Sequence, residues 1–128
     1  MADTIVMARG DTKVFTLTLY DEDGSTPYSA AAATTIIMTV KTGVDAGSAT
    51  FTVTLADGDI VVSGAGNNVL TVTIKPTKTT SLLLTGGSVS YIWDIEVKHS
   101  STVVQTFPRS AAGNYEAGVL TVNADLTV

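Results

Sequence analysis

The chain has 128 residues, no cysteine and a net charge of −5. This length fits one domain, residues 1–128, with a single core, and the lack of cysteine excludes disulfides and thiolate chemistry. The negative charge argues against nucleic acid as a partner, because phosphate backbones are bound by clustered Lys and Arg.

The N-terminus lacks a basic start followed by an apolar run, and no apolar segment approaches the ~18 residues of a membrane span. We therefore expect neither a signal peptide nor a membrane partner. Only 15% of residues are charged, and the mean hydropathy is +0.33. With so few charges, Thr, Ser, Ala and Gly cover part of the surface, which suits a permanent protein contact. The alternative is a monomer with a Thr-rich sheet surface.

Thr and Val are the most prominent residues of the chain, and their branched Cβ atoms favour strands. A short first strand is expected at residues 5–8. In a second, at 14–20, Phe15 and Leu17 alternate with Thr, as on a half-buried strand. An Asp-Gly pair ends it. Further strands are expected at the ranges 35–41, 49–55 and 60–63.

The stretch from residue 69 to 98 organises the fold. A strand at 69–75 ends at a proline, and Thr77 can cap a short helical turn over residues 77–84. A strand at 89–98 follows, in which apolar and charged residues alternate around Trp93, the only Trp. We expect Trp93 to be buried between two sheets, because it removes more area from water than any other residue.

Strands at 103–107 and 119–123 complete the pattern of short strands separated by turns. This pattern predicts an all-β fold, an immunoglobulin-like antiparallel β-sandwich of about eight strands with one short helical turn near residues 77–84. The expected core consists of Phe15, Leu17, Phe51, Val72, Tyr91, Trp93 and Ile95.

One tripeptide, Arg9-Gly10-Asp11, has the sequence of an integrin ligand. Such a ligand must lie on an exposed loop of a protein that meets animal cells. The simpler interpretation is a turn between strands, with Asp11 accepting hydrogen bonds from nearby backbone.

Two acidic turns could suggest calcium. Asp21, Glu22 and Asp23 precede one glycine, and Asp57 and Asp59 flank another. The fixed ligand spacing and distal Glu of an EF-hand loop are missing, so we expect solvated turns and no metal.

No set of residues adds up to an active site. His99, the only His, stands beside Ser100 and Ser101 in a predicted hairpin turn, without the elbow of a serine hydrolase. Asp94 and Glu96 are neighbours on one face of a strand and do not oppose each other across a cleft. We expect a solvated turn His, no enzyme activity and no cofactor.

Several fragments, in this order, carry a resemblance to a known family: Arg9-Gly10-Asp11-Thr12, Asp23-Gly24, Thr79, Thr80 and Leu82, Tyr91-Ile92-Trp93-Asp94-Ile95, and Gly118-Val119-Leu120-Thr121-Val122 with Asp125 and Thr127. Together they resemble the immunoglobulin-like domain of tailed-bacteriophage virion proteins. That domain occurs at the N-terminus of baseplate upper proteins and fibre proteins, and in small free-standing virion proteins. The resemblance covers nearly the whole chain.

The chain departs from the family pattern at three places. Val89 stands where the family usually has Gly, and Trp93 stands where Tyr is commoner. The sequence also ends at Val128, with no fibre or receptor-binding part after it. This last departure favours a small, copy-rich virion component over a fibre.

The resemblance implies a non-enzymatic structural protein of the virion, assembled in the host cytoplasm. Its partners would be other capsid or tail and baseplate proteins and further copies of itself, in head decoration or as a head/tail accessory. The alternatives are a baseplate or tail-fibre adaptor, and a carbohydrate- or receptor-binding module, although periodicity buries most aromatics. Terminal strands tend to lie at sheet edges, so the expected interface residues are Ile5, Val6, Met7, Ala8, Leu126 and Val128.

Overall fold

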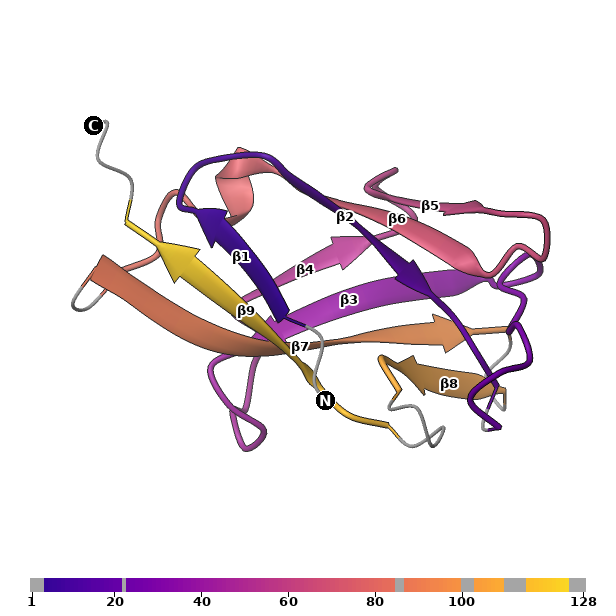
Figure 1. Ribbon diagram of the computed structural model, residues 1–128. Coiled ribbons are helices and arrows are strands. Elements are labelled where there is room, and N and C mark those ends of the chain that lie inside the picture. Colours follow the sequence, from indigo (N-terminus) through magenta and orange to yellow (C-terminus); the bar gives the residue numbers. More distant parts are fainter. Residues whose placement is uncertain (1–3, 22, 85–86, 100–102, 110–114, 125–128) are drawn as a thin grey trace.

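The computed structural model describes residues 4–21, 23–84, 87–99, 103–109 and 115–124, and in them nine strands form two sheets that pack face to face (Figure 1). The six-stranded sheet has the order β1 (Thr4–Ala8), β9 (Gly118–Asn123), β7 (Ser88–Lys98), β3 (Thr35–Lys41), β4 (Phe51–Thr54), and β8 (Val104–Phe107) pairs with β7 beyond the end of β9. The three-stranded sheet has the order β2 (Lys13–Thr18), β6 (Val69–Ile74), β5 (Ile60–Ser63).

The prediction of an all-β sandwich is confirmed, with one correction to its topology. All strand pairs are antiparallel except β1 and β9, which run parallel with Ile5 opposite Leu120. The two strands are far apart in sequence, so no hairpin fixes their direction and the alternation within each strand does not reveal it.

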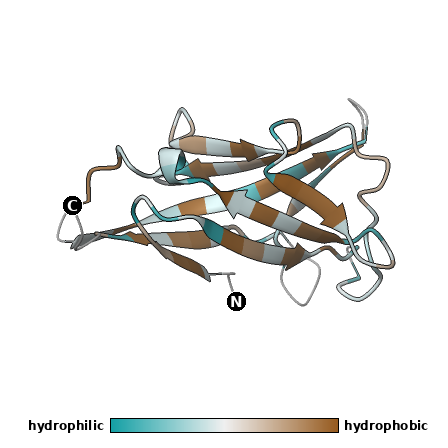
Figure 2. Cartoon of the chain, turned by 90° about the horizontal axis from the view of Figure 1, so that it is seen from above, coloured by the Kyte–Doolittle hydropathy of each residue, from teal (hydrophilic) through white to brown (hydrophobic). Residues whose placement is uncertain are grey.

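More and less hydrophobic residues alternate along the strands (Figure 2). On β7, Tyr91, Trp93, Ile95 and Val97 are buried, while the residues between them are partly exposed. Successive side chains of a strand point to opposite faces, so β7 gives one face to the core and one to solvent.

Trp93 lies between the sheets and is 2% exposed. Its ring meets that of Phe15 on β2, with 5.5 Å between the centroids and an interplanar angle of 57°. On the neighbouring strand Gly118 stands directly opposite Trp93, and a Cβ at Gly118 would lie 2.2 Å from the indole Cε2. The indole therefore occupies the space that any side chain at position 118 would need.

The structure buries five of the seven expected core residues, namely Leu17, Val72, Tyr91, Trp93 and Ile95. Phe15 and Phe51 are a correction, because both are only half-buried and pack against the margin of the core. Phe15 lies on β2, an edge strand of its sheet, and Phe51 lies on β4, an edge strand of the other. A side chain on an edge strand has core neighbours on one side only.

The helical turn is shorter than predicted and begins earlier. It is a 3₁₀ helix, η1 (Pro76–Lys78), and Lys75 occupies the cap position without a side-chain cap hydrogen bond. Thr77 is therefore not the cap. Proline has a backbone φ suited to a first helical position, where its missing N–H costs nothing, so the helix starts at Pro76.

Candidate functional site

The Arg9-Gly10-Asp11 tripeptide forms the turn between β1 and β2. The Arg9 guanidinium donates to the Leu82 carbonyl at 3.0 Å, and the Gly10 N–H donates to the buried Thr79 hydroxyl at 2.8 Å. The Asp11 N–H closes the turn on the Ala8 carbonyl at 3.2 Å. The arginine thus fastens this turn to the segment after η1.

The first acidic turn is organised by Asp23. One carboxylate oxygen accepts the backbone N–H groups of Ser25 and Thr26 at 2.9 and 2.8 Å, and the other accepts the Thr26 hydroxyl. These hydrogen bonds, that of the Thr26 hydroxyl first, lower the pKa of Asp23 to about 2. Both oxygens thus serve the turn itself. Glu22 lies outside the described residues.

The second acidic turn differs from the prediction of two solvated carboxylates. Asp57 is exposed, but Asp59 is 6% exposed, and its carboxylate lies 3.0 Å from the ammonium of Lys75. Asp59 directly precedes β5 and Lys75 directly follows β6, and these strands are neighbours. The sheet therefore brings the pair together across the chain, and Asp59 is a paired, buried charge.

His99 is also a correction, because it is half-buried and not a solvated turn residue. Its ring meets Tyr28 edge-on, with 5.6 Å between the centroids. The β7–β8 hairpin is present, while Ser100 and Ser101 of its turn lie outside the described residues. His99 packs as an aromatic side chain beside the core.

Asp94 and Glu96 line a shallow groove of about 420 Å³ on the outer face of the six-stranded sheet. Tyr115 donates its hydroxyl to Asp94 at 2.8 Å, and Glu96 pairs with Lys98 at 3.2 Å. Partial burial, and then the hydrogen bond to Asp94, raise the pKa of Tyr115 to about 12. Tyr115 lies in a Gly/Ala/Asn loop without periodicity, so no sequence pattern pointed to it.

In the described part of the chain, no three His, Cys, Asp or Glu side chains are placed to hold a metal ion. The same residues contain no helix of the length and apolarity that a membrane span requires.

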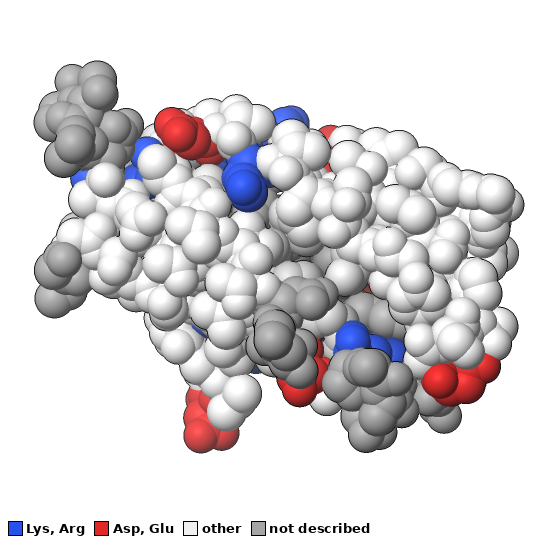
Figure 3. Space-filling model, in the orientation of Figure 1, with Lys and Arg blue, Asp and Glu red and all other residues white. Residues whose placement is uncertain are grey.

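Within its strands the outer face of the three-stranded sheet carries no charge, and the Lys75–Asp59 pair lies at one end of it. It consists of the outward residues of its three strands, which are Val14, Thr16 and Thr18 on β2, Val69, Thr71 and Thr73 on β6, and Val61 and Ser63 on β5. We call this surface the Val/Thr face. Over these strands the visible surface in Figure 3 is largely free of charged side chains. The opposite sheet, in contrast, presents Asp94, Glu96 and two lysines on its outer face.

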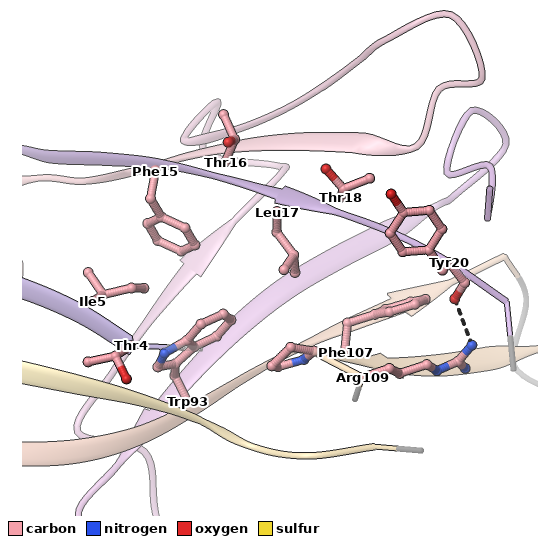
Figure 4. A pocket seen from close by; sticks show the side chains of 11 residues that line it. Thr4, Ile5, Phe15, Thr16, Leu17, Thr18, Tyr20, Trp93, Phe107 and Arg109 are labelled. Atoms are coloured by element: carbon pink, nitrogen blue, oxygen red, sulfur yellow. Dashed lines mark hydrogen bonds between the residues drawn. The ribbon is translucent and has the colours of Figure 1, made fainter. Parts of the chain in front are cut away.

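A second groove, of about 440 Å³, opens beside the edge of β2. Phe15 and Leu17 point into it toward Trp93 and Phe107, whereas Thr16 and its neighbour Thr18 point away (Figure 4). At its far end Arg109 lies over the Phe107 ring, with 4.5 Å to the centroid, and donates to the Tyr20 carbonyl at 2.9 Å. The groove thus has an apolar floor, with threonines along its margin and one cation at its far end. We call it the β2 groove.

The expected interface residues lie only partly at the surface. β1 is an edge strand of its sheet, yet Ile5 and Met7 point inward and are 6% and 5% exposed. Val6 faces outward and is 50% exposed. β1 thus lies at a sheet edge as expected, with only its outward side chains exposed, and an interface at this edge stays a prediction. Leu126 and Val128 lie outside the described residues.

Comparison with models of known protein families gives no match, and neither does comparison with curated proteins. Among solved structures the chain is similar to AggA, the major subunit of aggregative adherence fimbriae type I from Escherichia coli, at 11% identity. The match covers 97% of this chain and 91% of that chain, with a TM-score of 0.34. So low a similarity assigns neither a family nor a function.

Proposed function

We propose that the chain is a non-enzymatic structural component of a tailed-phage virion, a small β-sandwich that binds other virion proteins as a head decoration or head/tail accessory. The motif order from Arg9 to Val122 supports the virion assignment through its family resemblance. The single observation that supports assembly most is the uncharged Val/Thr face.

An uncharged face of this composition is suited to permanent contact. Burying a charge costs several kcal/mol unless it is paired, whereas Val buries apolar surface at a gain and Thr adds a small, adaptable hydroxyl. Both side chains are stiff at χ1, so ordering them at an interface costs little entropy.

The size of the Val/Thr face indicates how it would be used. Its strands of six, six and four residues span at most roughly 14 by 20 Å, or roughly 300 Å² per copy. A stable complex buries about 800 Å² per partner, so one such contact is weak by itself. Many copies on a symmetric particle raise the effective concentration and make weak contacts strong together. This favours a multicopy component.

The test is retention on particles purified from cells that produce the chain. We expect it to copurify with intact particles at many copies and to remain through a salt wash. Separating heads from tails distinguishes a head component from a baseplate or tail-fibre adaptor. Val61, 54% exposed on the Val/Thr face, gives the variant Val61→Lys, which should lower retention. Leu83, 89% exposed outside this face, gives the control Leu83→Lys, which should not. Absence from particles would refute the proposal.

A second candidate, a carbohydrate-binding module, is favoured by the groove around Tyr115. There a half-exposed aromatic ring lies beside the carboxylates of Asp94 and Glu96, and these groups suit stacking on a sugar and accepting its hydroxyls. Titration with maltohexaose, cellohexaose and chitohexaose, followed by amide chemical shifts, tests it. Binding of one of these sugars that is lost in Tyr115→Ala would support a carbohydrate-binding module. Unchanged chemical shifts with all three sugars would exclude it.

A further inference from the structure

β2 is the longest edge strand in the described part of the chain, and its outer edge is unpaired from Val14 to Thr18. β2 has six residues and pairs only with β6, whereas the edge strands β4, β5 and β8 have four each and β1 has five. Natural edge strands are commonly protected by proline, bulges, inward charges or short length. From Val14 to Thr18, β2 has none of these features, while Lys13, on the same face as Phe15, places one charge at the start of the strand.

The register identifies the backbone groups on this edge. The Leu19 N–H donates to the Asn68 carbonyl at 2.7 Å, and the two residues continue the register in which Leu17 faces Leu70. Hydrogen-bonded and non-bonded pairs alternate in an antiparallel ladder, so residues 15 and 17 bond to β6. The N–H and C=O groups of Val14, Thr16 and Thr18 therefore point to the open side.

Arg109 sets the limit of this open stretch. Tyr20 is the next residue of the same parity, and its carbonyl accepts the Arg109 guanidinium at 2.9 Å (Figure 4). The edge is thus occupied beyond Thr18 and open from Val14 to Thr18.

We propose that this edge pairs with the same edge of a second copy, antiparallel about a two-fold axis at Thr16, joining the two three-stranded sheets into one of six strands. The inference rests on the proposed function, since it names a partner through which a multicopy component assembles. In this register Val14 faces Thr18 of the other copy, Thr16 faces Thr16, and Thr18 faces Val14. All three are hydrogen-bonded pairs, so the edge groups of both copies are satisfied.

Side chains and charge favour this occupant. On the inner face Phe15 meets Leu17 of the other copy, an aromatic–aliphatic pair of the kind that stabilises sheets, and the half-buried Phe15 gains cover. On the outer face Thr16 of one chain lies beside Thr16 of the other. Lys13, the only charge on β2, stands at opposite ends of the antiparallel pair. Two chains of net charge −5 repel each other elsewhere, and they meet here along an uncharged edge. A two-fold contact requires this self-complementarity.

Hydrogen exchange and sedimentation of the isolated full chain test the pairing. Sedimentation should show a monomer at low concentration and a dimer at high concentration. The amides of Val14, Thr16 and Thr18 should exchange freely in the monomer and slow at least about tenfold in the dimer, because their N–H groups become bonded.

Two proline variants locate the contact. Thr16→Pro removes an N–H that faces the open edge and that the monomer does not use, a position where edge strands tolerate proline. Val6→Pro is the matched control on β1, where the Arg9 N–H bonds to Asn123 of β9 at 2.8 Å, so that the Val6 N–H faces away from β9. Thr16→Pro should abolish the dimer and Val6→Pro should preserve it. The reverse result would place the contact on β1 and overturn the proposal.

A cysteine variant keeps the test decisive if Thr16→Pro fails to fold. The chain has no cysteine, and a hydrogen-bonded antiparallel pair sets its Cα atoms about 5.5 Å apart, within disulfide range. Thr16→Cys should therefore form a disulfide dimer under mild oxidation. Val14→Cys should not, because Val14 faces Thr18 of the other copy. Equal cross-linking of both, or of neither, would overturn the register.

These outcomes separate the two proposals. A chain that stays monomeric, with freely exchanging β2 amides at every concentration, overturns the edge pairing, while its retention on particles is measured independently. A chain that dimerises through β2 yet is absent from particles overturns the virion assignment alone.

Discussion

Gly118→Ala should destabilise the fold through a single added methyl group. An ideal Cβ at Gly118 lies 2.2, 2.4 and 2.6 Å from the indole atoms Cε2, Nε1 and Cζ2 of Trp93. Contacts below 3.0 Å to a rigid ring must be relieved by moving the ring or the strand. Trp93 is 2% exposed and packed against Phe15 on the other sheet, so it has little room to move.

The expected cost follows from two opposing effects. Overpacking a core costs about 1–3 kcal/mol, and three close contacts with a ring place this case near the upper end. Replacing Gly by Ala at a compatible backbone angle gains about 0.4–1 kcal/mol through the unfolded state. Gly118 has no positive φ, so this gain applies. The net loss is about 2 kcal/mol, or roughly 6–10 °C in Tm for a domain of this size.

Urea unfolding followed by far-UV circular dichroism measures this loss, with Gly43→Ala as the matched control. A Cβ at Gly43 would meet nothing within 4 Å, so that variant should be neutral or slightly stabilised. Trp93→Phe in the Gly118→Ala background should recover part of the loss, because the smaller ring leaves room for the methyl. Equal stability of Gly118→Ala and Gly43→Ala would refute the packing of Trp93 over Gly118.

Three further predictions concern charged and hydrogen-bonded groups. The folded pKa of Asp23, about 2, lies below its ordinary 3.8, so its turn contributes stability above pH 3.8 that is lost as the pH falls toward 2. Asp23→Ala should thus lower the Tm clearly more at pH 6 than at pH 2, and an equal loss at both would contradict this. Lys75→Met leaves the buried carboxylate of Asp59 unpaired. It should lower the free energy of unfolding in urea by about 1–2 kcal/mol, less than for a fully buried pair because Lys75 is half-exposed. Unchanged stability would count against the ion pair. Spectroscopic titration should show one Tyr ionising near 12, and Asp94→Asn should lower the pKa of Tyr115; no change would exclude their hydrogen bond.

The features that the sequence predicted are those set by local alternation. The period of two along residues 89–98 placed Tyr91, Trp93 and Ile95 on one face, and the structure buries all three. Alternation specifies the face of a strand, so the two-sheet architecture followed from it. It does not specify the neighbour of a strand. The half-buried state of Phe15 depends on β2 being an edge, and that position is a property of the whole topology.

The residues that the sequence placed incorrectly, or did not suggest, depend on contacts between distant segments. From the sequence, Asp59 is expected to be an exposed turn residue. In the structure, the pairing of β5 with β6 places Lys75 beside it. The parallel β1–β9 pair joins the two ends of the described chain, and no local pattern encodes it. Tyr115 reaches Asp94 from an irregular loop. In each case the deciding interaction spans tertiary structure, where propensity and periodicity carry no information.

The most direct test of the proposed role is the copy number of the chain on purified particles. Quantitative mass spectrometry of gradient-purified particles, washed at high salt and compared with a known capsid subunit, gives this number. We expect the chain at many copies per particle, in a fixed ratio to a virion protein. A chain that is absent from the particles, or present at a ratio that falls with each wash, would contradict a structural role in the virion.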